Sequence, residues 1–430
     1  MPTHLDDPTT HARHALPEAQ AGTEPLAAAG AGRRVDEGGS VVPVPSSAHL
    51  TATRRIALVH DYLTQFGGAE RVLEVLHEVF PEGQIFTSLV DRSALPPRVA
   101  SWDLHETWLA RLPRATRVHR GLIPLYPAAF RGLAEELAEV DVILADSSAW
   151  AHHVGAHAET VLICYCHSPA RFLYGDRDYL APAKIPPILG HVASIVFAAL
   201  RRTDRRAAAR VDRYVANSRN VAARIRAIYG RDAAIVYPPV DVDRFAGPEI
   251  PPEPWYLVVS RLVPHKRIDL AVDVATRYGL PLKVIGDGRT LARLRRRAGP
   301  TVEFLGRMDD AQVVEHYRRA RALILPGAED FGMTAVEAQA AGRPVIAYGA
   351  GGALESILAG ETGVLFGCQT VESLMAAIED FEARHWDANR CRTNALRFGR
   401  ERFLREIAAE VEAALETREL KRGAIARSAD

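Results

Sequence analysis

Short apolar runs alternate with helical segments along most of this chain, and no other sequence feature limits the fold as much. β-Prone runs recur at residues 56–59, 142–145, 161–164 and 214–216. Between them, apolar residues follow a helical spacing, as in Ala69–Phe80. This alternation predicts βαβ units that share a parallel sheet.

The same rhythm starts again after residues 236–255, a segment with six prolines that reads as a linker. Further strands are expected at residues 256–259, 282–285, 302–304, 322–325, 345–347 and 363–366, with helices at 311–321 and 333–341. A last helix, about residues 400–418, has no strand after it. The sequence therefore predicts an α/β protein with two doubly wound, Rossmann-like domains and a ligand site in the cleft between them.

The expected organisation has five parts. They are a disordered tail (1–50), an N-terminal domain (51–243), a C-terminal domain (244–398), a final helix (399–418) and a second disordered tail (419–430). A length of 430 residues suits two domains.

Composition excludes several classes of protein. Basic and acidic residues number 53 each, so the chain is not a polyelectrolyte built for nucleic acid. Its four cysteines fit neither a zinc site nor a disulfide framework, which favours a reducing cytosol. No secretory leader is visible, and the longest apolar stretch, residues 188–200, is too short to span a bilayer. We expect a soluble protein, attached at most to a membrane surface.

Two motifs of the N-terminal half follow predicted strands. Gly67 and Gly68 come where a helix begins, so backbone N–H groups there can approach an anion or a sugar closely. His167 follows the run that ends at Cys164, at a position where a histidine can hydrogen-bond a substrate. A tight turn and a packed structural histidine are the alternatives.

Two motifs of the C-terminal half could contact a nucleotide. Arg261 and Lys266 follow the first strand and could reach one diphosphate; lysine is rare here, with four in the chain, so Lys266 is the more telling. Gly286 lies in a turn that could pass close to a base or phosphate. A solvated charge run and an ordinary turn are the alternatives.

The segment Glu329–Glu337 is the most specific motif. Gly332, between Phe331 and Met333, precedes a helix whose N-terminus offers N–H donors to phosphate or sugar oxygens. Glu329 and Glu337 are suited to accept hydrogen bonds from paired hydroxyl groups, one from a hexose and the other from a ribose. The alternative is a helix-start charge and a surface glutamate.

These motifs together resemble glycosyltransferase family 4, the retaining enzymes of the GT-B fold, over residues 54–417. Glu329 and Glu337 match its paired-glutamate motif, and Arg261 and Lys266 match its phosphate-binding pair. Gly67-Gly68 and His167 match its N-terminal glycine loop and active-site histidine. Segments such as ICYCHSPARFLYG resemble bacterial mannosyltransferases of surface-polysaccharide assembly, although Phe172-Leu173-Tyr174 stands where that subgroup often has a tryptophan.

The resemblance implies a hexosyltransferase that retains anomeric configuration and needs no cofactor, metal or covalent intermediate. It implies GDP-mannose as donor and a lipid-linked or glycan acceptor. His167 and Glu329 would hold the hexose, Glu337 the ribose, and Arg261 and Lys266 the leaving phosphate. The final helix would cross back to the first domain.

Membrane contact and three other functions stay open. Arg111, Arg114, Arg117 and Arg120 recur near an apolar segment, which would suit the inner face of an anionic cell membrane or a solvated face beside a core helix. The other functions are a hexosyltransferase that uses a UDP-sugar, a phosphorylase or epimerase of the same fold, and a non-catalytic scaffold that binds a nucleotide sugar.

Overall fold

The computed structural model describes residues 54–175 and 187–429. The tail predicted for residues 1–50 lies outside these ranges. Within them the chain forms a seven-stranded sheet followed by a six-stranded sheet, and every strand pairing is parallel. The expectation of two doubly wound α/β domains is confirmed.

The first sheet has the strand order β3-β2-β1-β4-β5-β6-β7. Its strands are β1 (Ile56–His60), β2 (Gln84–Thr87), β3 (Leu104–Glu106), β4 (Val142–Ser147), β5 (Val161–Cys166), β6 (Arg213–Ala216) and β7 (Ala233–Ile235). The helices of this domain are α2 (Gly68–Val79), α3 (Pro97–Ala100), α4 (Ala115–Val118), α5 (Tyr126–Arg131), α6 (Arg171–Tyr174), α7 (Pro187–Ala208) and α8 (Arg219–Tyr229). Short 3₁₀ turns, such as η3 (His119–Leu125) and η5 (Ala151–His153), connect them.

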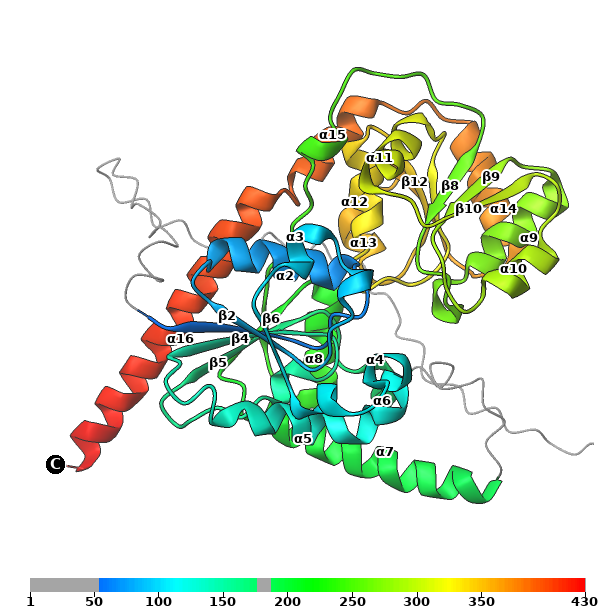
Figure 1. The fold of residues 1–430 in the computed structure, drawn as a ribbon. Coiled ribbons are helices and arrows are strands. Elements are labelled where there is room, and N and C mark those ends of the chain that lie inside the picture. Colours follow the sequence, from blue (N-terminus) through cyan, green and yellow to red (C-terminus); the bar gives the residue numbers. More distant parts are fainter. Residues whose placement is uncertain (1–53, 176–186, 430) are drawn as a thin grey trace, which may run out of the picture. The chain divides into compact units, whose positions relative to one another are not determined.

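The first sheet has a hydrophobic core on each face, and successive residues of its central strands pack into alternate cores. In β1, Ala57 and Val59 pack into the core on one face, whereas Leu58 packs into the core on the other. Side chains of a strand alternate between faces, so a central strand buried on both sides must be apolar throughout. Helices α5, α7 and α8 contribute to the first of these cores, and α2 and the final helix to the second (Figure 1).

The final helix, α16 (Arg400–Ala429), completes the core of the first domain. Phe403, Ile407 and Val411 are fully buried there against strands β4 and β5 and helix α2. The return to the first domain is thus confirmed. The disordered tail expected from residue 419 is wrong, because α16 continues to Ala429, with Arg418 bonded to Asp212 at 3.0 Å.

The second sheet has the order β10-β9-β8-β11-β12-β13. Its strands are β8 (Tyr256–Val259), β9 (Leu282–Ile285), β10 (Val302–Gly306), β11 (Leu323–Leu325), β12 (Val345–Tyr348) and β13 (Gly363–Phe366). Its helices are α9 (Ile268–Tyr278), α10 (Leu291–Arg297), α11 (Asp310–Arg319), α12 (Met333–Ala340), α13 (Ala353–Ser356), α14 (Val371–Glu382) and α15 (Ala388–Leu396).

The proline-rich segment packs onto the second domain. Val240 and Phe245 are buried in its core, and the N–H of Val240 bonds the carbonyl oxygen of Phe398 at 3.0 Å. Residues on both sides of the boundary expected at 244 therefore belong to the second core. None of the helices in the described ranges is long and apolar enough to cross a bilayer.

Strand order reverses between β1 and β4 in the first sheet and between β8 and β11 in the second. In open α/β sheets, ligands bind beyond the carboxyl ends of the strands at these reversal points. The loops that follow β1, β4, β8 and β11 are therefore the first place to look for a site.

Candidate functional site

Lys266 and Glu329 form an ion pair at the reversal point of the second sheet. Lys266 ends the 3₁₀ turn η8 (Pro264–Lys266), and Glu329 lies in the loop after β11. Their side chains are only 18% and 11% exposed. Gly327 lets the two loops close, because a Cβ there would lie 2.8 Å from the Cα of Lys266. The structure thus brings together two of the residues predicted for the site.

Arg261 is exposed beside this pair, and its Nη1 lies 3.4 Å from the amide oxygen of Gln65 in the first domain. Gly286 supports the same strand end, since a Cβ there would lie 1.9 Å from the carbonyl oxygen of Ser260. Its φ of 130° also disfavours a larger residue. Gly286 therefore allows the backbone to come close to the loop that carries Arg261. The sequence had suggested a close approach to a base or phosphate.

Positive charge gathers around His265. Burial lowers the pKa of His265, and the charges of Lys266, Arg171 and Arg261 lower it further, to about 3. Burial is the larger cause, and the charge of Asp330 acts in the opposite direction, but three cations still converge on this ring. A place where cations converge favours an anionic ligand. Arg171, at the start of α6 in the first domain, was not among the residues predicted for the site.

Two helix N-termini meet near this charge. Helix α2 begins after Gly67 and α12 after Gly332, and a Cβ on Gly68 would lie 3.3 Å from the sulfur of Met333. The first N–H groups of a helix have no partner within it and attract anions. The N–H of Gly67 itself is not free, because it bonds the carboxylate of Glu70 at 2.8 Å.

Phe331 and Glu337 take different positions around α12. The ring of Phe331 is 2% exposed and packs against Tyr237 and Phe398, so its side chain belongs to the core. A ligand could meet Phe331 only through its backbone. Glu337 is half-buried and accepts a hydrogen bond from the hydroxyl of Tyr317 at 2.9 Å.

Glu337 also lies close to a cation of the first domain. Burial lowers the pKa of Arg71, but the charge of Glu337 and the hydrogen bond to Asp310 outweigh burial and raise it. Arg71 bonds the Asp310 carboxylate at 2.6 Å, and Arg244 bonds the other oxygen of Asp310 at 2.9 Å.

His167 lies directly after β5 and bonds a buried acid. Its Nε2 is 2.5 Å from Oδ1 of Asp146, and Oδ2 of Asp146 is 2.8 Å from Nδ1 of His60. His60 ends β1, and it faces Asp146 of β4 in the register of the sheet. The reversal point of the first sheet is therefore occupied by two histidines around one carboxylate.

Asp330 links the loop of Glu329 to the first domain. Its carboxylate pairs with Arg171 at 2.8 Å and Arg224 at 2.9 Å, and its carbonyl oxygen accepts from the hydroxyl of Ser218 at 2.7 Å. Arg224 also bonds the hydroxyl of Ser168 at 2.8 Å, next to His167. Asp330 and Arg224 thus connect the predicted residues of the two domains, although the sequence did not single them out.

A second buried histidine cluster has ligand atoms that could hold a metal ion. His152, His153 and Asp204 bring these atoms within 4.8 Å of one another. Asp204 is already saturated, however. It accepts from both histidines at 3.0 Å and from the hydroxyls of Tyr174 and Tyr229 at 2.7 and 2.9 Å.

A bound metal would also leave a buried ring nitrogen of His153 with an unsatisfied hydrogen. The Nδ1 of His153 is buried without a hydrogen-bond partner. Binding a metal through Nε2 would put the ring proton on this Nδ1 and create an unpaired buried donor, which is costly. The cluster is better explained as a hydrogen-bonded node that holds α7 to the sheet.

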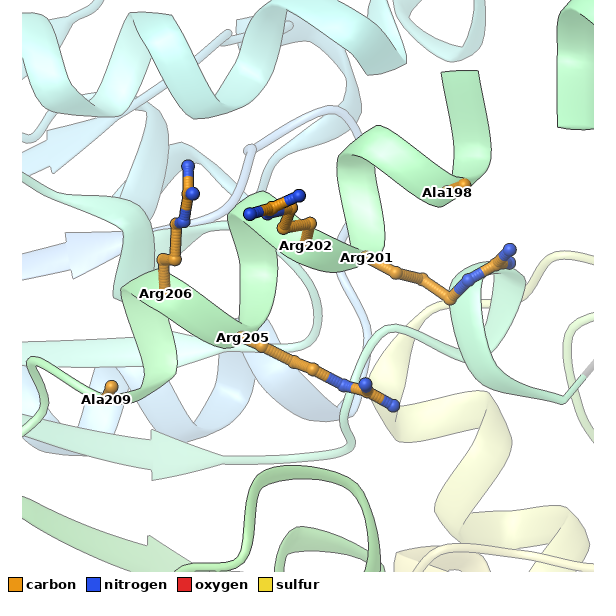
Figure 2. A pocket seen from close by; sticks show the side chains of 6 residues that line it. All are labelled: Ala198, Arg201, Arg202, Arg205, Arg206 and Ala209. Carbon is orange, nitrogen blue, oxygen red and sulfur yellow. The ribbon is translucent and has the colours of Figure 1, made fainter. Parts of the chain in front are cut away.

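A hollow of about 420 Å³ lies along α7, and none of the residues predicted for the site lines it (Figure 2). It is lined by five residues of α7 and by the residue that follows the helix: Ala198, Arg201, Arg202, Arg205, Arg206 and Ala209. Figure 2 shows that the four guanidinium groups spread in different directions instead of converging on one point. Arg201 bonds the carbonyl oxygen of Leu173, and Arg205 lies over the ring of Tyr174. This hollow has no arrangement that would hold a defined anion.

Two family models together cover residues 66–398. The model described as Glycosyltransferase Family 4 matches residues 66–244, and the model described as Glycosyl transferases group 1 matches residues 240–398. The first model spans the glycine loop and His167. The second spans Arg261, Lys266 and the segment from Glu329 to Glu337.

Curated relatives match over shorter stretches. A D-inositol 3-phosphate glycosyltransferase of Catenulispora acidiphila is 32% identical over 36% of this chain and 44% of its own length. A GDP-mannose-dependent alpha-mannosyltransferase of Mycolicibacterium smegmatis is 33% identical over 28% of this chain and 32% of its own length. The chain thus spans less than half the length of either relative.

Solved structures share the fold at low identity. HepE of Anabaena in complex with UDP has a TM-score of 0.62 and 18% identity, over 84% of this chain and 100% of that one. Sucrose-phosphate synthase of Thermosynechococcus elongatus has a TM-score of 0.58 and 20% identity, over 87% of this chain and 100% of that one. These structures show the GT-B fold, and the two family models identify the chain as a member of glycosyltransferase family 4.

Proposed function

We propose that this protein is a retaining hexosyltransferase that moves mannose from GDP-mannose to a lipid-linked or glycan acceptor, in the assembly of a cell-surface polysaccharide or glycolipid. The observation that carries the proposal is the gathering of Lys266, Arg261 and Arg171 around His265, beside the N-terminus of α12. Glycosyl transfer from a nucleotide sugar releases a nucleoside diphosphate, whose charge must be neutralised as the bond breaks.

The charged residues predicted for the site, together with His167, have parts in this reaction. Lys266, freed from Glu329 when the donor binds, supplies a point charge to the diphosphate, and Arg261 supplies a planar pair of donors. The N–H groups at the start of α12 face the same phosphates. Glu329 is then available to accept a hydrogen bond from the hexose, opposite His167. Glu337 holds the ribose.

The chemical step needs no covalent bond to the protein. The bond between C1 of the hexose and the phosphate oxygen breaks, and the acceptor oxygen bonds C1 on the same face. The proton of the acceptor hydroxyl passes to an oxygen of the departing phosphate. Positioning and charge stabilisation then supply the rate enhancement, and no metal or cofactor takes part.

The choice of GDP-mannose rests on relatives rather than on a contact to the base. Two proteins of Mycolicibacterium smegmatis that match this chain, at 29% and 33% identity, are named GDP-mannose-dependent mannosyltransferases. HepE of Anabaena, by contrast, was solved with UDP-glucose. A hexosyltransferase that uses a UDP-sugar is accordingly the second candidate.

The test measures donor binding and donor consumption together. Thermal unfolding is followed with GDP, UDP and ADP and with their sugars, since a ligand of the native state raises the midpoint. We expect the largest shift with GDP-mannose. Donor cleavage is then measured for the unchanged chain and for Lys266→Ala, which should lose about 10²- to 10³-fold in rate, as removal of one transition-state donor does elsewhere.

Lys283→Ala is the matched control, because Lys283 belongs to the same domain and packs over the ring of Trp255. It should keep the full rate. A preference for UDP-sugars would move the proposal to the second candidate. Binding of nucleotide sugars without cleavage, with or without Lys266, would instead support a non-catalytic scaffold.

A further inference from the structure

Three polar side chains meet where the first sheet reverses its strand order. His60 ends β1, Asp146 lies in β4, and His167 follows β5. Asp146 is fully buried and lies between the two rings, with one oxygen 2.8 Å from Nδ1 of His60 and the other 2.5 Å from Nε2 of His167. The side chain of His60 is 3% exposed and that of His167 is 12% exposed. Only His167 of the three therefore has a surface open to a ligand.

The positions of the protons follow from the charge on Asp146. Burial alone would raise the pKa of Asp146, but the charges and hydrogen bonds of His167 and His60 outweigh burial and lower it. An ionised carboxylate only accepts hydrogen bonds, so both ring nitrogens that face it carry hydrogen. His167 thus donates from Nε2.

His60 supplies the balancing charge. Burial alone would lower the pKa of His60, but the hydrogen bond and charge of Asp146 raise it to about 9. His60 is then a cation near neutral pH and pairs with the Asp146 anion.

One ring nitrogen of His167 remains. Among the described residues its Nδ1 has no hydrogen-bond partner, and it is not enclosed as the Nδ1 of His153 is. In a neutral imidazole, one nitrogen is a donor and the other an acceptor. With Nε2 donating to Asp146, the neutral form of His167 leaves Nδ1 as an acceptor for a ligand.

We infer that Asp146 and His60 are positioning residues, which hold His167 in its Nε2–H form and present Nδ1 as an acceptor to a hydroxyl group of the donor sugar. The inference rests on the proposed function for the identity of the ligand. The substrate must then meet one requirement. Its sugar must place an O–H group, which can donate a hydrogen bond, next to Nδ1 of His167.

The Asp204 cluster is a natural control for this role. It too is a buried carboxylate that accepts from two histidines, in the same domain, but both of its histidines are closed to solvent. Asp204→Asn should therefore reproduce the loss of stability expected of Asp146→Asn without reproducing an effect on the sugar.

The experiment reads the tautomer and the chemistry separately. In the full chain labelled with ¹⁵N-histidine, the signals of His167 are assigned by their loss in His167→Gln. We expect a protonated Nε2 and an unprotonated Nδ1 in the unchanged chain. Asp146→Asn should average the two nitrogens, whereas Asp204→Asn should leave them as they are.

Kinetics then test the consequence for the sugar. Asp146→Asn and His60→Gln should lower kcat/KM for the nucleotide sugar on the order of 10²-fold, the effect of misplacing a positioning group. Binding of the nucleoside diphosphate alone should be unchanged in both variants, because it has no sugar to meet Nδ1. A fold defect would weaken both ligands together.

The outcomes separate the two proposals. If the unchanged chain consumes no nucleotide sugar, the proposed function is wrong, whatever the protonation of His167. The sugar hydroxyl is then also wrong as the ligand of Nδ1. If the chain does consume the donor, the inference alone is overturned by a protonated Nδ1 at His167, or by Asp146→Asn turning over the donor as fast as Asp204→Asn.

Discussion

At the scale of single residues, the Lys266–Glu329 ion pair can exchange one partner for another at little cost in stability. Two nearly buried opposite charges stabilise each other, yet each loses hydration, so such a pair contributes little net stability. In the proposed reaction, a diphosphate would replace Glu329 as the partner of Lys266 and release Glu329 for hydroxyl groups. In the ion pair itself, neither of the two charges is left alone.

Two buried histidines of the first domain should respond to pH in opposite directions. The pKa of His60 is raised from 6.5 to about 9, so its contribution is complete below pH 6.5 and is lost as the pH rises through about 9. Burial lowers the pKa of His153 from 6.5 to about 4, so its contribution is present above pH 6.5 and is lost as the pH falls toward 4.

Urea unfolding at pH 6.5 and pH 9 tests the His60 part of this prediction. The unchanged chain should lose free energy of unfolding over this interval, up to about 3 kcal/mol at 1.36 kcal/mol per pKa unit. His60→Gln should lose much less. Equal losses in the two proteins would show that His60 is not a cation in the folded state.

Single residues were also the hardest feature to predict. Glu329 and Lys266 were recognisable because motif and strand position agreed. Asp146 was not recognisable, because its role depends on two histidines that only the folded strands β1 and β5 bring to it. For the same reason Phe331 gave no sign that its ring points into the core: its neighbour Phe398 is far along the chain.

At the scale of elements, α16 is the most consequential helix. The ring of Phe403 is fully buried and lies against Tyr165 of β5, with ring centroids 5.6 Å apart. Phe403→Ala should cost about 3–5 kcal/mol, the range for removing a buried aromatic ring.

Thermal unfolding with a probe in the first domain measures this effect, and Arg405→Ala, an exposed position on the same helix, is the control. If Phe403→Ala shifted only the second domain, α16 would not be part of the first core.

The central strands that the sequence predicted differ physically from the edge strands β3 and β7, which it did not predict. β4 as far as Ala145 and the whole of β5 are buried on both faces, and these stretches are continuous apolar runs. β3 and β7 have three residues each and lie at the edges of the sheet, with half-exposed side chains. An edge strand owes its form to its neighbour, and a sequence window of three residues does not contain that neighbour.

At the scale of the whole molecule, one basic surface suits contact with a membrane. Arg111, Arg114, Arg117 and Arg120 are all exposed. Trp108, Val118 and Leu125, on neighbouring turns, are 38%, 48% and 38% exposed. The larger apolar residues of this segment, Ile123, Tyr126 and Phe130, are instead buried in the core. We therefore expect membrane binding to depend mainly on these charges, with a small apolar contribution.

Flotation with liposomes measures this contact. We expect binding to vesicles rich in anionic lipid at low salt, and release as salt rises, because each exposed arginine contributes about 1 kcal/mol near such a surface. Changing Arg111, Arg114 and Arg117 to serine should abolish binding. The same change at Arg293, Arg295 and Arg296 of α10 should not abolish binding. If both triple variants lost binding equally, net charge alone would explain the effect.

The path of α16 has a consequence for how the protein is made. Phe403, Ile407 and Val411 fill the first domain, yet they are synthesised after the whole of the second. On the ribosome the first domain must therefore wait, with part of one face of its sheet uncovered, until α16 has been synthesised. A chain that stops at the end of the second domain would carry all the motifs of the site on a first domain that lacks its cover.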